Sequence, residues 1–266
     1  MGHSAQHYLE RQQAALAGRP RGIGSRIVEL IRRQGAVATA RHLRTVSLHK
    51  LHERLHDRRR SASEAQPTGG KRELSTLTIA SERRTDGVHY LGSPTRVLDW
   101  LLTALPLDRK DYTFVDIGAG RGRVMAWALD KGFKRVHGIE FAAELAAEAV
   151  ANMQHVARQR PHLPVAFVDH ADATRAIVPG GPLVVYLFNP FGAETLKAFV
   201  AHLGLESGAA GRPIEIIYVN PRHAKVLQQL PQLRRRPLPV GLRLKLGLAS
   251  PYAVHIYSNS FGTTVG

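Results

Sequence analysis

The sequence contains no cysteine. Disulfides, thiolate nucleophiles and thiolate zinc sites are therefore excluded, and the absence fits a reducing compartment such as the cytoplasm, where we expect the protein. No apolar run reaches the roughly 18 residues that a membrane-spanning helix needs. The opening residues, MGHSAQHYLERQQ, lack the apolar core of a signal peptide, and Gln6 stands where a myristoylation motif has serine or threonine. We therefore expect no transmembrane segment, signal peptide or myristoyl group.

Acidic residues are scarce and unevenly placed. The 21 Asp and Glu stand against 37 Lys and Arg, which gives a formal net charge of +16. Residues 1–60 hold 13 of the basic residues and four acids, and no acid follows Tyr218. Such a balance favours polyanionic partners, and a nucleic acid or an acidic protein could bind the basic N-terminal region. The alternative is an arginine-rich surface that is simply solvated.

The chain of 266 residues is long enough for one sizeable α/β domain with a smaller appendage. We predict a basic helical extension over residues 1–60, a linker and lead-in over 61–86, and the main domain over 87–266. The linker contains SASEAQPTGG, a small and polar stretch. The extension matches no known functional pattern, and dimerisation is one role that it could have.

Three histidines in the extension are spaced three and four residues apart: His49, His52 and His56. At this spacing they share one face of a helix. A polar helix face explains them better than a metal site, so we predict no bound metal.

The rest of the domain is organised around residues 112–141, which read YTFVDIGAGRGRVMAWALDKGFKRVHGIEF. A first apolar run ends at Asp116. Three glycines then stand at alternate positions: Gly118, Gly120 and Gly122. Apolar residues at helical spacing follow, and a second short apolar run ends in Glu140. The order of strand, glycine turn, helix, strand and acid predicts one right-handed βαβ unit in which the glycines let the chain approach a ligand.

The glycine spacing distinguishes between ligands. A dinucleotide site needs G-x-G-x-x-G or A, but Arg123 occupies its third small position and Gly122 comes one residue early. Together with Asp116, the pattern is D-x-G-x-G-x-G. This pattern resembles motif I of the class I S-adenosylmethionine-dependent methyltransferases, and it disfavours a nicotinamide or flavin cofactor.

The resemblance implies S-adenosyl-L-methionine as the cofactor. Asp116 would face the ammonium group of its methionine end, and Glu140 would accept hydrogen bonds from the ribose diol. It also implies the fold: a doubly wound, mostly parallel seven-stranded sheet that ends in a C-terminal antiparallel hairpin. We predict that hairpin in residues 242–248 and 252–257, which partly alternate between apolar and polar residues.

Further cofactor contacts follow from the same resemblance. The pair Asp172-Ala173, which comes after a predicted strand over residues 164–168, is similar to the acid and small residue that hold the adenine amino group. Phe141 is a candidate to stack on the adenine, although it could equally pack under the next helix. Tyr90 lies in the loop expected to cover one lip of the site, with loop packing as the alternative.

The candidate acceptor site follows an apolar run over residues 183–188, which predicts a strand buried on both faces. It ends in Asn189-Pro190-Phe191, which resembles the Asn-Pro-Pro-Tyr/Phe signature of amino-directed methyltransferases but lacks the second proline. Asn189 could accept N–H groups of the acceptor, Pro190 could stiffen the turn, and Phe191 could stack on a planar acceptor. The alternatives are a helix cap for Asn189 and core packing for Phe191. Tyr186 and Glu194 are weaker candidates.

A second predicted strand, over residues 214–219, also ends in Asn-Pro, at Asn220-Pro221. The sequence leaves open whether the two Asn-Pro steps share a geometry.

The sequence thus indicates a methyltransferase that modifies nitrogen on a macromolecule, either a protein lysine or a nucleic-acid base. The alternatives are a small-molecule methyltransferase and a non-catalytic nucleic-acid-binding protein that retains the fold.

Overall fold

The computed structural model describes residues 23–40, 43–44, 47, 71–72, 90–91, 93, 95–208, 210–250 and 252–260. The chain divides into two compact units, Met1–Leu48 and His49–Gly266. In the first, helix α2 spans Ile23–Gln34 and residues 36–40 are also helical, which confirms the helical prediction for this part. The three spaced histidines and the proposed linker sequence lie outside the described residues.

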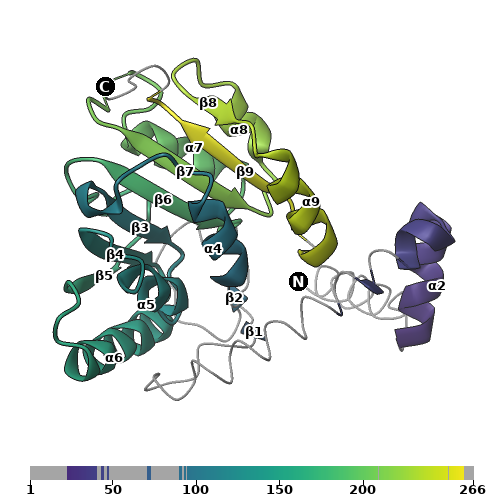
Figure 1. Ribbon diagram of the computed structural model, residues 1–266, viewed down its shortest axis with the longest axis horizontal. Coiled ribbons are helices and arrows are strands. Elements are labelled where there is room, and N and C mark those ends of the chain that lie inside the picture. Colours follow the sequence, from purple (N-terminus) through teal and green to yellow (C-terminus); the bar gives the residue numbers. More distant parts are fainter. Residues whose placement is uncertain are drawn as a thin grey trace, which may run out of the picture. The chain divides into compact units, whose positions relative to one another are not determined.

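The second unit contains a seven-stranded sheet in the order β5-β4-β3-β6-β7-β9-β8 (Figure 1). Its strands are β3 (Thr113–Ile117), β4 (Arg135–Glu140), β5 (Ala166–His170), β6 (Leu183–Phe188), β7 (Ile214–Val219), β8 (Arg234–Arg236) and β9 (Val254–Ser258). The first five in this spatial order are parallel, while β9 is antiparallel to both of its neighbours. The central strands β3, β6 and β7 are mostly apolar because both of their faces are buried, and their polar residues are Thr113, Asp116 and Glu215 besides the hydroxyls of Tyr186 and Tyr218.

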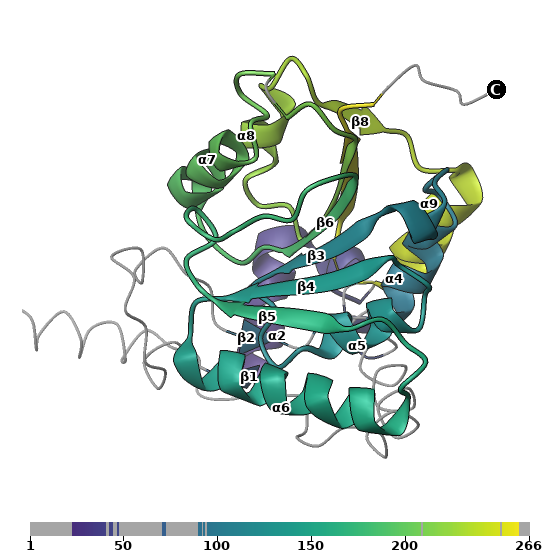
Figure 2. The same cartoon turned by 90° about the vertical axis from the view of Figure 1, so that its left-hand side faces the viewer.

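Helices cover both faces of the sheet, so the doubly wound fold predicted from the sequence is confirmed (Figure 2). The helices are α4 (Thr95–Leu102), α5 (Arg123–Leu129), α6 (Ala143–Gln159), α7 (Ala193–His202), α8 (Ala224–Gln228) and α9 (Val240–Ala249). One core cluster packs α4, α5 and α9 against the sheet, with Trp127 of α5 fully buried. The other packs α7 and α8 on the opposite face. A 3-10 turn, η4 (Arg109–Asp111), precedes β3, and a separate antiparallel pair is formed by β1 (Lys71–Arg72) and β2 (Tyr90–Leu91).

The antiparallel pair at the C-terminal edge is confirmed, but its first strand was predicted in the wrong place. Residues 242–248 belong to helix α9, and β8, Arg234–Arg236, pairs with β9 instead. The sequence LRLKL alternates as a strand does. However, Leu242 and Leu246 are also four residues apart, and both are buried on one helix face, whereas Leu244 is exposed. Tertiary packing therefore selects the helix.

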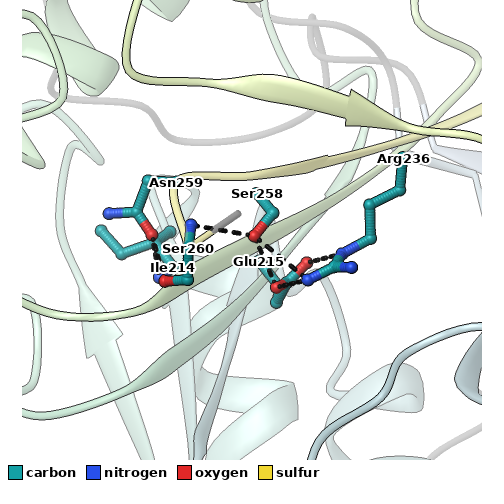
Figure 3. A network of polar contacts seen from close by, with 6 residues as sticks. All are labelled: Ile214, Glu215, Arg236, Ser258, Asn259 and Ser260. Carbon is teal, nitrogen blue, oxygen red and sulfur yellow. Dashed lines mark hydrogen bonds and ion pairs between the residues drawn. The ribbon is translucent and has the colours of Figure 1, made fainter. Parts of the chain in front are cut away.

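A buried ion pair explains how three consecutive arginines form an edge strand (Figure 3). Glu215 of β7 is buried, and Arg236 of β8 donates to both of its carboxylate oxygens, Nε at 2.9 Å and Nη2 at 2.8 Å. Ser258 of β9, which lies between the two strands, donates to the same carboxylate at 2.7 Å. These hydrogen bonds raise the pKa of Arg236. The pair holds β8 against the sheet because an unpaired buried carboxylate would be costly.

Gly138 of β4 is required by the packing of α5, which gives a first prediction. A Cβ at this position would lie 2.3 Å from Met125 Sδ and 2.9 Å from Ala119 Cβ. Gly138→Ala is therefore expected to lower the free energy of unfolding by about 1–3 kcal/mol through overpacking. Urea denaturation would measure the loss. Gly180→Ala, whose Cβ meets nothing within 4 Å, is the control and should change stability by less than about 0.5 kcal/mol. Equal stability of the two variants would contradict the packing.

Candidate active site

The candidate site lies where the strand order reverses. Strand β3 is flanked by β4 on one side and by β6 on the other, although β6 comes three strands later in the chain. In such sheets the crevice at the carboxyl ends of the strands binds ligands, because the loops diverge there. Asp116 near the end of β3 pairs in register with Gly138 and Tyr186, and Glu140 is the last residue of β4. The structure thus brings the two predicted acids to one edge of the sheet.

The glycine turn that follows β3 uses backbone angles that favour glycine. Gly118, Gly120 and Gly122 have φ values of 75°, 55° and 78°. The N–H groups of Gly118 and Ala119 donate to the carbonyl of Ile139 in β4, at 2.9 and 3.1 Å. A Cβ on Gly118 would lie only 3.0 Å from Pro190 Cβ. The turn therefore packs directly against the Asn-Pro step that follows β6.

Glu140 holds this turn from the neighbouring strand. Its Oε2 accepts from the N–H of Gly120 at 2.7 Å, and its Oε1 accepts from the N–H of Ala142 at 2.9 Å. The side chain is 3% exposed. Burial raises the pKa of Glu140, while these backbone N–H groups act in the opposite direction. The N–H of Phe141 also lowers the pKa of this carboxylate. A carboxylate has about four lone-pair positions, so at least one remains for another donor.

The carboxyl of Asp116 is also buried, but its hydrogen bonding differs from that of Glu140. It is 2% exposed, and among the described residues none donates a hydrogen bond to its carboxylate. Burial, and then the nearby negative charge of Glu140, raise the pKa of Asp116 to about 8. A buried acid without donors gains most from a cation, because a cation offsets both the desolvation and the repulsion.

The raised pKa of Asp116 predicts a pH dependence of folding. Its folded pKa of about 8 exceeds 3.8, the ordinary pKa of an aspartate, so between these values the folded state keeps a proton that the unfolded state has lost. Stability should therefore fall as pH rises from 4 to 8, by up to about 1.4 kcal/mol per pH unit from this group. Asp116→Asn should flatten the curve. Urea denaturation at several pH values would test this, and parallel curves for both proteins would contradict it.

Two side chains of α6 support the turn, and sequence analysis missed both. Asn152 is buried and donates from Nδ2 to the carbonyl of Arg121 at 2.9 Å. Glu148 forms an ion pair with Arg121, with Oε2 and Nε 2.8 Å apart. The available signal was a polar Asn152 beside the apolar stripe of this helix, since a polar residue on a core-facing side needs a partner.

The predicted adenine contacts also reach this edge. The N–H of Ala171 donates to the carbonyl of Glu140 at 2.9 Å, which places the loop after β5 beside the end of β4. In that loop Asp172 Oδ1 accepts from the N–H and the hydroxyl of Thr174, at 2.9 and 2.8 Å, and Ala173 is buried. Phe141 is half-buried next to Glu140. The backbone of Tyr90 lies in β2, and its side chain is outside the described residues.

The two Asn-Pro steps share one geometry. Phe188 and Val219 are partners in register at the ends of β6 and β7, so Asn189 and Asn220 follow at equivalent positions. Both asparagines have positive φ, 43° and 53°, a conformation that asparagine tolerates better than most residues. The hydroxyl of Tyr218 donates to Asn189 Oδ1 at 3.3 Å and accepts from the N–H of His223, two residues after Pro221, at 3.4 Å.

The other candidate acceptor residues differ in their surroundings. Phe191 is 8% exposed and packs edge-on against Phe199, with ring centroids 6.1 Å apart, which favours the core-packing alternative. Tyr186 is buried and stacks on Phe114. Glu194 is 77% exposed at its side chain and pairs with Lys197. Helix α7 begins after Gly192, so Asn189 is not its cap. Asn189 and Pro190 remain the best-placed acceptor candidates.

In the part of the chain that the structure describes, every helix is too short or too polar to span a membrane. Within the same residues, no group of three or more His, Cys, Asp or Glu is arranged to hold a metal ion.

Comparison with known proteins gives similarity in structure alone. No family model matches the sequence, and no curated protein matches it. Among solved structures, the chain is similar to a putative methyltransferase, yhhF, from Escherichia coli, with 18% identity over 61% of this chain and 85% of that one and a TM-score of 0.45. A putative methylase from Haemophilus influenzae has 16% identity over 62% and 97%, with a TM-score of 0.42.

A magnesium protoporphyrin IX methyltransferase from Synechocystis, solved with bound SAM, has 14% identity over 62% of this chain and 75% of that one, with a TM-score of 0.42. The fold is the Rossmann-like α/β fold implied by the resemblance to class I methyltransferases, and the strand order and the site's position at the switch point define it. No family is identified. The similarities are too distant to indicate an activity, which depends on the site itself.

Proposed function

We propose that this protein is an S-adenosyl-L-methionine-dependent methyltransferase that modifies a nitrogen atom of a macromolecule. One observation carries the proposal: the buried carboxyl of Asp116, to which no described residue donates a hydrogen bond, stands beside a glycine turn held by Glu140. This arrangement suits a ligand with a cation at one end and a diol at the other.

The residues present fit this cofactor. The ammonium of a methionine moiety would supply the cation that Asp116 lacks. Glu140 keeps acceptor capacity for a ribose hydroxyl while it holds the turn. Asp172 and Ala173, beside the end of β4, are suited to the adenine. The glycine spacing leaves no G-x-G-x-x-G arrangement for a pyrophosphate, which disfavours a dinucleotide.

When bound, the cofactor supplies an electrophilic methyl group on a sulfonium. The acceptor nitrogen would take this methyl group, and S-adenosylhomocysteine and the proton of the acceptor N–H would be the other products. The protein's task is to align the reactants and exclude water. We assign to Asn189 Oδ1, which also accepts from the Tyr218 hydroxyl at 3.3 Å, the role of accepting an N–H of the methyl acceptor. Pro190 packs this step against the glycine turn.

A methyl-transfer assay would test the proposal. Purified protein is incubated with methyl-tritiated S-adenosylmethionine and cell extract, and the label is then sought in RNA, DNA, protein and small molecules. We expect label in a macromolecule, and its absence with Asp116→Asn. Label only in small molecules would support the small-molecule alternative. Failure to bind S-adenosylhomocysteine, together with no label, would leave a non-catalytic binding protein.

A further inference from the structure

A groove lies between helix α9 and the segments at the β8–β9 edge of the sheet, with a volume of about 630 Å³. On the helix side, Arg243, Leu246, Gly247 and Ser250 are spaced by three and four residues, so they form one face. The opposite wall is formed by residues 235–238 and 252–255. A Cβ on Gly247 would meet nothing within 4 Å, so this part of the groove is open.

The groove lies at the same end of the sheet as the candidate acceptor site, although neither Asn189 nor Pro190 lines it. Tyr252, which lines it, packs edge-on against Phe188 with ring centroids 5.0 Å apart, and Phe188 directly precedes Asn189. The neighbouring Ala253 accepts a hydrogen bond from the N–H of Asn220 at 2.9 Å. A ligand in the groove would therefore lie at the same edge of the sheet as both Asn-Pro steps.

The charge of the groove favours a nucleic acid over a lysine-containing protein as the methyl acceptor. Its described lining includes Arg235, Arg236 and Arg243 and no acid. Arg236 forms an ion pair with Glu215 (Figure 3), whereas Arg243 is exposed to solvent. No Asp or Glu follows Glu215 in the sequence. Such a surface repels the cationic side chain of a lysine-rich protein and attracts phosphates. An aromatic ring such as Tyr252 additionally provides a face on which a base can stack.

We propose that this groove binds the sugar-phosphate backbone of a single-stranded nucleic acid, with Arg243 contacting phosphate and Tyr252 contacting a base. The proposal deepens the proposed function, because it makes a nucleic-acid base the methyl acceptor. The binding itself requires no cofactor, so the two proposals can be tested separately.

Binding would be measured by fluorescence anisotropy with a fluorescein-labelled 20-mer of uridine. Arg243→Ala is expected to weaken binding roughly three- to tenfold and to reduce the slope of log affinity against log salt concentration by about 0.7, the value for one lost phosphate contact on a single strand. Lys245→Ala is the control, because Lys245 is exposed on the same helix but does not line the groove. Equal losses in both variants would overturn the proposal.

A steric test does not depend on charge. Gly247→Trp fills the groove and should weaken binding of the 20-mer at least about tenfold, the order of magnitude of one lost stacked base. Gly241→Trp, on the same helix with no atom within 4 Å of its Cβ and outside the groove, should bind as the wild type does. Circular dichroism confirms that both variants are folded. Unchanged binding by folded Gly247→Trp would place the nucleic acid elsewhere.

Two arms identify other outcomes. The same variants are titrated with phosphatidylserine vesicles and with polyglutamate. If the groove variants lost affinity only for the vesicles, the groove would be a membrane site, and if they lost affinity only for polyglutamate, it would bind an acidic protein. Either result would overturn the proposal. Calorimetry with S-adenosylhomocysteine is run in parallel. Groove variants should keep wild-type affinity for it, whereas a wild type that binds the 20-mer but not S-adenosylhomocysteine would refute the proposed function and leave the groove intact.

Discussion

Replacing Asp116 with asparagine is expected to weaken binding of S-adenosylhomocysteine by at least about tenfold, because one charge-assisted hydrogen bond to the ammonium group is lost. The substitution keeps the shape of the side chain, so the turn beside it should remain intact. Since the pKa of Asp116 is about 8 without a cation, the wild type should also release a proton on binding below that pH. Asp116→Asn should not.

Isothermal titration calorimetry in two buffers of different ionisation enthalpy measures both the affinity for S-adenosylhomocysteine and the number of protons released on binding. Asp111→Asn, an exposed acid of the turn before β3, provides the control and should bind as the wild type does. Wild-type affinity and unchanged proton release in Asp116→Asn would mean that the ammonium is held elsewhere, and that the buried carboxyl has no part in binding.

Glu140→Ala is expected to affect both folding and binding. The N–H groups of Gly120 and Ala142 would lose their acceptor in a buried place, at a cost of about 1–3 kcal/mol each. The cofactor's ribose would lose its partner as well, so affinity should fall at least about tenfold. Glu140→Gln keeps one acceptor oxygen and should lose less stability.

Thermal unfolding and calorimetry would be compared for Glu140→Ala, Glu140→Gln and Glu206→Ala, the last an exposed acid far along the chain. We expect the order of stability to be Glu206→Ala, Glu140→Gln, Glu140→Ala. If Glu140→Ala were as stable as Glu206→Ala, the carboxylate would not be holding the glycine turn. If it were unstable but bound S-adenosylhomocysteine normally, Glu140 would be structural only.

The βαβ unit could be predicted because its signals are local. The glycines, the apolar periods and the two acids lie within about 30 residues, and each constrains the backbone or its burial directly. The strands β6 and β7 were predicted with the observed bounds, since a continuous apolar run followed by Asn-Pro marks both the buried strand and its end. Asp116 and Glu140 lie at or near the C-terminal ends of the adjacent parallel strands β3 and β4, so both carboxylates come to the same edge of the sheet.

Features that depend on long-range contacts could not be read from the sequence. Helix α9 alternates like a strand, and only the burial of Leu242 and Leu246 against the domain selects the helix. Strand β8 consists of three arginines, a composition that predicts no strand, and it pairs with the sheet through Glu215, 21 residues away. The partners of Asn189 and Asn152 likewise come from distant segments.

The repeated Asn-Pro step could be predicted only in part. Its sequence is visible at Asn189 and at Asn220, but its meaning depends on register. Only the pairing of Phe188 with Val219 shows that both asparagines stand at equivalent positions, and only the positive φ at each shows why asparagine suits them. The hydrogen bond from the Tyr218 hydroxyl to Asn189 is likewise indicated by no local pattern.

A crystal structure with bound S-adenosylhomocysteine would show whether Asp116 and Glu140 hold the ligand. We expect that the ribose hydroxyls donate to the Glu140 carboxylate and that the amino group of the methionine moiety lies within hydrogen-bonding distance of Asp116. A ligand bound away from these two acids, or a glycine turn blocked by side chains in the presence of excess ligand, would contradict it.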